Sequence, residues 1–465
     1  MKTKLASLAL VLLLLMAGLV LISGVVQDRQ NNRQVAVQGV AQSLAGPQTL
    51  MGPLIHMACT EEWVGAVDKD HPDANRREFH TVAAPATLKV QGSTQLEARG
   101  RGLHETQVFK LKAEVSATWA DLADLMPARR YPQSRLSCGQ PVLMMAVSDA
   151  RGIRQASVRI GGDSLALKPG TFYGNFPRGV HALLPTSVSK SAPLEARFEI
   201  ELVGTGQLSV VPLGGDTQVR LTSNWPHPSF GGQFLPVERT ITGEGFDASW
   251  RVSALASTAQ QDVLKRKAIC APGDDRSQES AACLEALGVN FVDPGDTYAL
   301  SDRATKYGLL FIGLTFLAVG LFEFMKSLRV HPVQYLLVGA AMSLFFLLLV
   351  SLSEHMAFGA AYALAAASCV LLLTYYAGHM LQGWARGLPF GLGIATLYGM
   401  LYVLLQMEQA ALLVGAVALF AVLAVVMSLT RRVDWYARFR QVPSPVAAGP
   451  ATASPAQAAP APRAP

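Results

Sequence analysis

Charged residues are scarce in this sequence. Asp, Glu, Lys and Arg make up 15% of its 465 residues, whereas hydrophobic residues make up 51%. Soluble domains carry about 25% charged residues, so the deficit indicates that part of the chain lies in lipid. The apolar residues concentrate at 5–26 and 307–429, and the stretch between these blocks has an ordinary soluble composition. The sequence therefore predicts membrane segments on both sides of one large extramembranous domain.

Recognisable enzyme motifs are also absent. The chain has no G-x-S-x-G elbow, no H-E-x-x-H and no G-x-x-x-x-G-K-[ST] loop. His104-Glu105 begins like a zincin motif, but Val108 stands where the second histidine is needed. We therefore expect no catalytic residues, no metal site and no cofactor. The net charge of +6 comes with basic residues at the ends of apolar runs, which is typical of membrane orientation, so we expect no nucleic-acid partner.

Six apolar runs are long enough to span a bilayer, which takes roughly 20 residues. The first, from Leu5 to Val26, contains no charge. A cleaved signal peptide has a shorter core of about 7–15 residues and a small-residue cleavage site, and no A-x-A pattern follows this run, so we interpret 1–26 as an uncleaved anchor. The second block divides at charges and prolines into spans at 307–325, 333–352, 357–376, 388–406 and 409–429. The predicted fold class is a six-span helical bundle with a large exported domain.

Lysine and arginine in the short loops indicate the orientation, because cytoplasmic loops carry an excess of both. Lys2 and Lys4 place the N-terminus in the cytoplasm. Six alternating spans then place the other flanking basic residues inside as well: Lys326, Arg329, Arg386, Arg431, Arg432, Arg438 and Arg440. The outer turns have none, and we expect Glu354 and His355 there to be solvated. Both termini are therefore predicted inside and residues 27–306 outside.

The exported stretch alternates between apolar and polar residues with period two at 110–119 and 194–202. Alternation buries one face of a strand and leaves the other in water. Shorter candidate strands lie at 142–148, 156–160, 207–213, 218–222 and 249–254. Many short strands predict a mainly β, sandwich-like domain. Residues 28–46 are a candidate continuation of the first helix, and the basic, then Pro/Ala-rich segment 430–465 is predicted to be a disordered cytoplasmic tail.

Four of the five cysteines lie in the exported stretch: Cys59, Cys138, Cys270 and Cys283. An even number in an oxidising compartment favours two disulfides. Cys270 with Cys283 is the more local pair, which leaves Cys59 with Cys138. Reduced thiols are the alternative, and a zinc site is disfavoured because there is no C-x-x-C.

One Pro/Gly-rich loop, 223–236, gathers the side chains that suit a ligand or partner site: Asn224, Trp225, His227 and Phe230. The alternative, which we favour, is a rigid crossover whose aromatic rings plug the core. Segment 173–182 has a similar composition and the same alternative, and 149–152 is interpreted as a turn with an Asp–Arg pair.

In the membrane, Glu323 is the notable polar residue. A carboxylate at the bilayer centre costs roughly +2.5 to +3.5 kcal/mol on insertion scales. Glu323 lies near Lys326 at the cytoplasmic edge, so a paired or snorkelling carboxylate is favoured over a relay or gate. Gly387 and Gly391 are spaced to allow close helix packing.

Several runs together resemble the CreD-type family of inner-membrane proteins. They are Ser148-Asp149-Ala150-Arg151-Gly152, Gly179-Val180-His181-Ala182, Ser223 to Phe230, Phe291-Val292-Asp293-Pro294, and a long run from Lys306-Tyr307-Gly308 through Val330-His331-Pro332-Val333-Gln334-Tyr335 to Leu352-Ser353-Glu354-His355. The resemblance implies a bacterial inner-membrane location, a periplasmic 27–306 domain and an association with cell-envelope integrity under a two-component regulator. It supplies no catalytic residues.

Two functional hypotheses follow. The leading one is a non-enzymatic envelope integrity or stress-response protein, whose periplasmic domain contacts periplasmic or cell-wall proteins while its spans contact membrane lipids. The alternative is a transporter or lipid-handling protein that uses the helix bundle. The sequence does not indicate an oligomeric state.

Overall fold

The structure is a computed structural model of the chain and describes residues 2–63, 76–101, 104–186, 188, 191–270, 283–291, 297–326, 330–380, 383–407 and 411–431. The chain divides into two compact units, residues 1–395 and 396–465, with the boundary inside α6 (Trp384–Gln406). The predicted tail beyond residue 431 and the segment between Cys270 and Cys283 lie outside the described residues.

Helices occupy the predicted spans. Besides α6 they are α1 (Lys2–Ser43), α3 (Thr297–Lys326), α4 (Pro332–Ser353), α5 (Phe358–Met380) and α7 (Ala411–Thr430). Four helical stretches in the described part of the chain are long and apolar enough to cross a membrane: Ala6–Ser43, Pro332–Ser353, Phe358–Met380 and Trp384–Gln406. The other two predicted spans coincide with α3, which begins before the predicted residue 307, and with α7. The first helix continues well past the anchor, as the sequence had suggested for 28–46.

Close backbone approaches fix the packing of these helices. Helix α1 packs against α3 and α4, and α4 packs against α5. A Cβ atom at Gly339 of α4 would lie 2.2 Å from Cδ1 of Leu15 in α1. A Cβ atom at Gly387 of α6 would lie 2.7 Å from the backbone of Gly378 in α5. Small residues therefore bring these helices together, as the sequence spacing predicted at Gly387.

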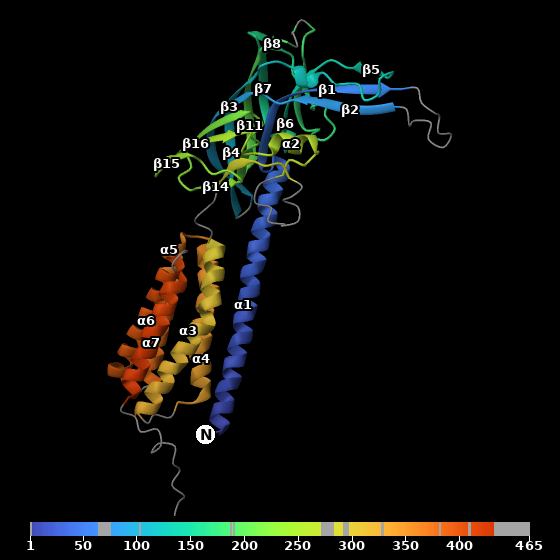
Figure 1. Cartoon of the computed structure of the whole chain (residues 1–465). Helices are drawn as coiled ribbons and strands as arrows, with labels where there is room; N and C mark the ends of the chain where they lie inside the picture. Colours follow the sequence, from blue (N-terminus) through green and yellow to red (C-terminus); the bar gives the residue numbers. More distant parts are fainter. Residues whose placement is uncertain are drawn as a thin grey trace, which may run out of the picture. The chain divides into compact units, whose positions relative to one another are not determined.

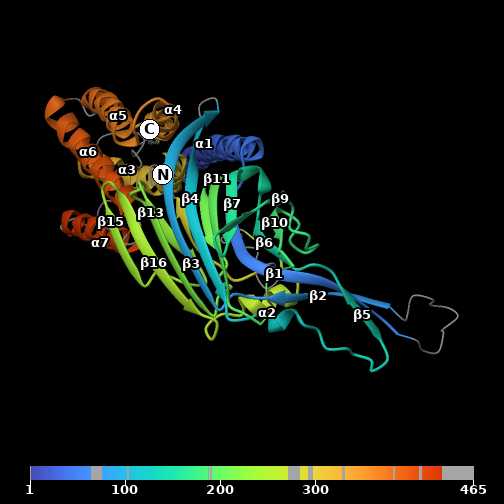
Figure 2. The ribbon, with the colours of Figure 1, turned by 90° about the horizontal axis from the view of Figure 1, so that it is seen from above.

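The stretch between the two apolar blocks forms two sheets. The first has nine strands: β14 (Pro228–Gly232), β17 (Leu287–Phe291), β12 (Gln207–Val210), β1 (Gln48–Glu62), β6 (Val142–Val147), β10 (Gly179–Leu183) and β9 (Lys168–Pro169) in that order, with β2 (Arg76–Ala83) and β5 (Arg135–Cys138) also paired to β1. The second has eight: β15 (Glu238–Thr242), β16 (Gly245–Ser253), β13 (Asp216–Ser223), β3 (Thr87–Arg101), β4 (His104–Trp119), β11 (Leu194–Thr205), β7 (Ile153–Ile160) and β8 (Asp163–Leu165). Short helices η1 (Ala123–Leu125), η2 (Ala150–Gly152) and α2 (Ala259–Leu264) complete the domain (Figures 1 and 2).

Both sheets contribute to one apolar core. Trp119 and Phe198 of the eight-stranded sheet lie in the same buried cluster as Ile55 and Met144 of the nine-stranded sheet. The alternating residues of β4 and β11 explain this arrangement, because every second side chain of β11 from Leu194 to Ile200 is buried. The polar side chains between them point to water, where cross-strand ion pairs form, such as that between Lys112 Nζ and Glu201 Oε1 at 2.9 Å.

Candidate functional site: the joint between helix α1 and the β domain

Helix α1 is much longer than a membrane span. Its 42 residues extend roughly 60 Å at about 1.5 Å per residue, which is about twice the ~30 Å thickness of the hydrocarbon core. The second half is polar and ends at Ser43, five residues before β1 begins at Gln48. One uninterrupted helix therefore joins the apolar segment to the first strand of the β domain (Figure 1).

An ion pair binds the end of this helix through hydrogen bonds. In the turn after β6, Nη2 of Arg151 lies 2.6 Å from Oδ2 of Asp149. Arg151 Nη1 also donates to the carbonyl oxygen of Gln42 in the last turn of α1, and Asp149 Oδ2 accepts from the Gly46 amide at 3.2 Å. These bonds, that to Arg151 first, hold the pKa of the Asp149 carboxyl at about 2. Asp149 is therefore ionised at any physiological pH, and the predicted Asp–Arg pair also fastens α1.

A buried amide completes the joint. Gln48 is fully buried, and its Nε2 donates to the carbonyl oxygens of Asp149 at 3.0 Å and Val203 at 3.1 Å. Gly152 leaves the space for this amide, because a Cβ atom there would lie 2.2 Å from Val203 O and 2.3 Å from Gln48 Nε2. A side chain at position 152 would therefore displace the amide or the strand.

The other side of the joint is formed by β11 and β4. The Thr205 amide donates to Gly46 O at 3.2 Å, and the Thr205 hydroxyl donates to Ala45 O at 3.2 Å. Val40 of α1 is buried against Val108 of β4 and Val203 of β11. Polar and apolar contacts together therefore fix the end of α1 on both sheets of the domain.

A second contact fastens α1 beside the helices. Arg29 Nε lies 3.5 Å from Oε1 of Glu354, the residue that ends α4. The Glu354 side chain is only 10% exposed, so the expectation that it is solvated is wrong, because Arg29 reaches it from the extended part of α1. His355 is exposed, as expected.

The loop proposed from sequence as an interaction site is largely occupied by contacts within the domain. Oδ1 of Asn224 accepts from the Leu96 amide at 2.9 Å. Trp225 Nε1 donates to His227 O at 3.0 Å, and the two rings lie edge to face. Phe230 contacts the rings of Phe246 and Trp250, so the arrangement agrees with the favoured crossover.

Glu323 bridges the end of α3 and the start of α4. Its Oε1 accepts from the Val330 amide at 3.2 Å, and its Oε2 accepts from the Tyr335 hydroxyl at 3.0 Å. The Lys326 side chain lies outside the described residues. The carboxylate therefore accepts two hydrogen bonds, which connect α3 to Val330 and to the first turn of α4.

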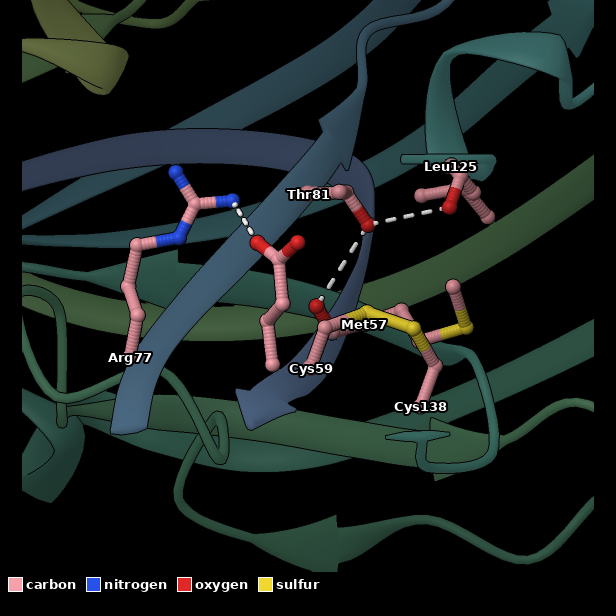
Figure 3. Close-up of a disulfide and its surroundings, with 7 residues drawn as sticks. Met57, Cys59, Arg77, Thr81, Leu125 and Cys138 are labelled. Carbon is pink, nitrogen blue, oxygen red and sulfur yellow. Dashed lines mark hydrogen bonds and ion pairs between the residues drawn. A yellow bond between two sulfur atoms is a disulfide. The ribbon is translucent and has the colours of Figure 1, made fainter. Parts of the chain in front are cut away.

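The four cysteines of the β domain are joined as Cys59–Cys138 and Cys270–Cys283. Cys59 and Cys138 face each other on β1 and β5, and Thr81 next to them donates to the carbonyl oxygens of Met57 and Leu125 (Figure 3). Cys369 in α5 is buried outside either disulfide. In the described part of the chain, no group of three or more His, Cys, Asp or Glu residues is placed to hold a metal ion.

Sequence reasoning found only one half of the joint. The turn at 149–152 was predicted, but its partners Gln42, Gly46 and Gln48 lie about a hundred residues away and carry no pattern of their own. The signal that could have pointed to them is the polar helix that follows the anchor without a break.

The architecture defines an integral membrane protein with several apolar helices and one large, mainly β domain. The family model described as "Inner membrane protein CreD" matches residues 1–436, and the chain belongs to this family. The inner membrane protein CreD of Escherichia coli (strain K12) is 36% identical over 435 residues, which cover 93% of each chain. The resemblance seen in the sequence is therefore confirmed, and with it an inner-membrane protein family.

Solved structures show only weak likeness. An M1 zinc metallopeptidase from Deinococcus radiodurans aligns with a TM-score of 0.23 and 10% identity, over 48% of this chain and 53% of that chain. A putative nutrient binding protein from Legionella pneumophila aligns with a TM-score of 0.22 and 9% identity, over 50% and 77% of the two chains. Scores this low carry no argument about function.

Proposed function

We propose that this chain supports cell envelope integrity or the envelope stress response as a non-enzymatic inner-membrane protein. Six spans anchor it in the membrane lipids with both termini in the cytoplasm. The sandwich-like β domain lies in the periplasm and contacts periplasmic or cell-wall proteins. The single observation that carries the proposal is the mechanical connection of α1, which is fastened to the β domain at one end and to the α4–α5 turn further back.

The connection suits the transmission of movement. Backbone hydrogen bonds run along a helix, so a displacement at one end is carried to the other when the helix is continuous. Asp149, Arg151 and Gln48 hold the far end of α1, and Arg29 holds it at Glu354. A force on the β domain would therefore be felt at the turn between α4 and α5.

The transport hypothesis has less support. Glu323 was its polar element, and the contacts of the carboxylate with Val330 and Tyr335 support a role in the turn between α3 and α4. No observation in the described helices favours transport over anchoring.

The test breaks α1 between its two attachments. Val35 lies there and is 66% exposed, so Val35→Pro removes little packing but costs about 3 kcal/mol of helix stability and kinks the helix. Val35→Ala is the matched control, because it removes the same apolar side chain and keeps the helix. Each variant is expressed in cells that lack the protein, and survival under envelope stress is measured at equal abundance in the inner membrane.

We expect Val35→Ala to protect like the wild type and Val35→Pro to lose protection while still inserting. Full protection by Val35→Pro at normal abundance would contradict transmission through a continuous helix.

A further inference from the structure

Two buried histidines hold one loop of the nine-stranded sheet. The loop, residues 170–178, joins β9 to β10 (Figure 2). His56 on β1 places Nε2 2.9 Å from the carbonyl oxygen of Thr171, and His181 on β10 places Nδ1 2.8 Å from the carbonyl oxygen of Gly170. Both side chains are only 1% exposed. Consecutive carbonyls of one loop are therefore held by imidazoles from two different strands.

The carbonyl partners determine the protonation state of both rings. A carbonyl oxygen only accepts hydrogen bonds, so the contacting nitrogens must carry the hydrogen. The neutral tautomers are thus Nε2–H for His56 and Nδ1–H for His181. The remaining nitrogens, His56 Nδ1 and His181 Nε2, are buried and have no hydrogen-bond partner among the described residues. Protonation of either ring would create a buried N–H donor without an acceptor, together with a buried charge.

The charged and titratable neighbours do not compensate such a charge. His80 on β2 lies 5.5 Å from His56 between ring centroids, and Arg266, which follows α2, acts on His80 as a like charge. Burial, and after it the proximity of His80 and His181, lower the pKa of His56 from 6.5 to about 4, although the hydrogen bond to Thr171 acts in the opposite direction. Burial raises the pKa of Tyr173, the loop residue that lies against the rings of His56 and His80, so that its hydroxyl stays neutral.

The backbone of the loop is strained at one residue. Phe172 has a φ of 59°, the left-handed region that a side chain other than glycine rarely adopts, and its ring is 70% exposed. Tyr173 and Phe176, which follow it in the loop, are buried in the core at 5% and 3% exposure. Opening of the loop would relieve the backbone at Phe172 and expose two aromatic rings. The histidine hydrogen bonds favour the closed loop, and the strain at Phe172 favours the open one. A loop balanced in this way can change its conformation locally when one of the two is altered.

We propose that the 170–178 loop is an acid-sensitive flap, which His56 holds closed while its ring is neutral and releases when that ring is protonated; His181 supplies the second hydrogen bond to the loop. Between the usual histidine pKa and the lowered pKa of His56, the open form binds more protons than the closed form, so the closed form loses stability as pH falls through this range. The inference concerns the domain alone and does not depend on the proposed envelope function.

The experiment is hydrogen–deuterium exchange on the full-length protein in nanodiscs, between about pH 7 and about pH 4.5, with protection corrected for the intrinsic exchange rate. In the wild type, we expect peptides covering 168–180 to lose at least about tenfold protection on acidification, while peptides of β4 and β11 keep theirs. The double variant His56→Gln/His181→Asn places an amide N–H where each imidazole N–H was and does not titrate. Its loop should remain protected throughout.

His80→Gln is the matched control, because His80 is exposed and its ring contacts Tyr173, whereas the two loop carbonyls are held by His56 and His181; this variant should open like the wild type. Equal loss of protection in the wild type and the double variant would overturn the proposal. Simultaneous loss of protection in the loop, β4 and β11 would also overturn it, because the proposal requires the loop to open by itself. If the double variant does not accumulate, the wild-type profile alone still decides between local opening of the loop and simultaneous loss of protection in the loop, β4 and β11.

Discussion

Gly152→Ala is the sharpest perturbation of the joint between α1 and the β domain. The added methyl group would lie 2.2 Å from Val203 O and 2.3 Å from Gln48 Nε2. Both distances fall more than about 1 Å short of ordinary van der Waals contact, so the Gln48 amide must leave or β11 must shift. Departure of the amide breaks its bonds to Val203 and Asp149. Buried groups left unsatisfied cost about 1–3 kcal/mol and overpacking costs about 1–3 kcal/mol, which together give roughly 2–6 kcal/mol.

The assay is thermal unfolding of the purified full-length protein, with limited proteolysis to locate the opening. A loss of this size should lower the midpoint by several degrees, at about 2–4 °C for each kcal/mol, and cleavage should begin near 42–48. Gly46→Ala is the matched control in the same joint, because a Cβ atom there meets nothing within 4 Å. If Gly152→Ala unfolds at the same temperature as Gly46→Ala, the space at Gly152 does not determine the joint and this reasoning is refuted.

Two further predictions concern the membrane part. Alkaline phosphatase fused after Gly204 should be active, and a fusion after Arg386 should be inactive, because the charge bias predicts that these positions lie on opposite sides of the membrane. The reverse pattern would overturn the predicted topology. Glu323→Gln should preserve abundance and envelope protection, since the amide oxygen still accepts from Val330 or Tyr335. Glu323→Leu removes both acceptors, so it should lower the stability of the protein by about 1–3 kcal/mol and with it the abundance. Loss of protection by Glu323→Gln at normal abundance would instead favour a proton relay.

Period-two alternation predicted the strands that have one solvent-exposed face and did not mark the strands that are buried on both faces. β4 and β11 alternate and were found, because water on one face requires polar residues at every second position. β1 is buried from Gln48 to Met57, and its central residues are apolar on both sides, so no alternation marks it. β6, buried along its whole length, was found only as a short apolar run.

The candidate site was less predictable because its parts are brought together by tertiary structure. Asp149 and Arg151 are neighbours in sequence, and their pairing could be predicted. Glu354 was expected to be solvated because the residues around it were predicted to form an outer turn, yet Arg29, from the other end of the chain, partly covers it. No local pattern contains that information, because the ion pair depends on how far α1 continues beyond the membrane segment.

The two attachments of α1 differ in strength, and the difference indicates where movement would be released. At the β domain, buried Gln48 and the close backbone at Gly152 form a joint that cannot slide without leaving polar groups unsatisfied. At the helices, the Arg29 side chain is 45% exposed, and such ion pairs contribute only about 0–1 kcal/mol. A displaced β domain would therefore carry the end of α1 with it and break the contact with Glu354 first. In the proposed function, the α4–α5 turn is then the point at which a change in the β domain reaches the helices.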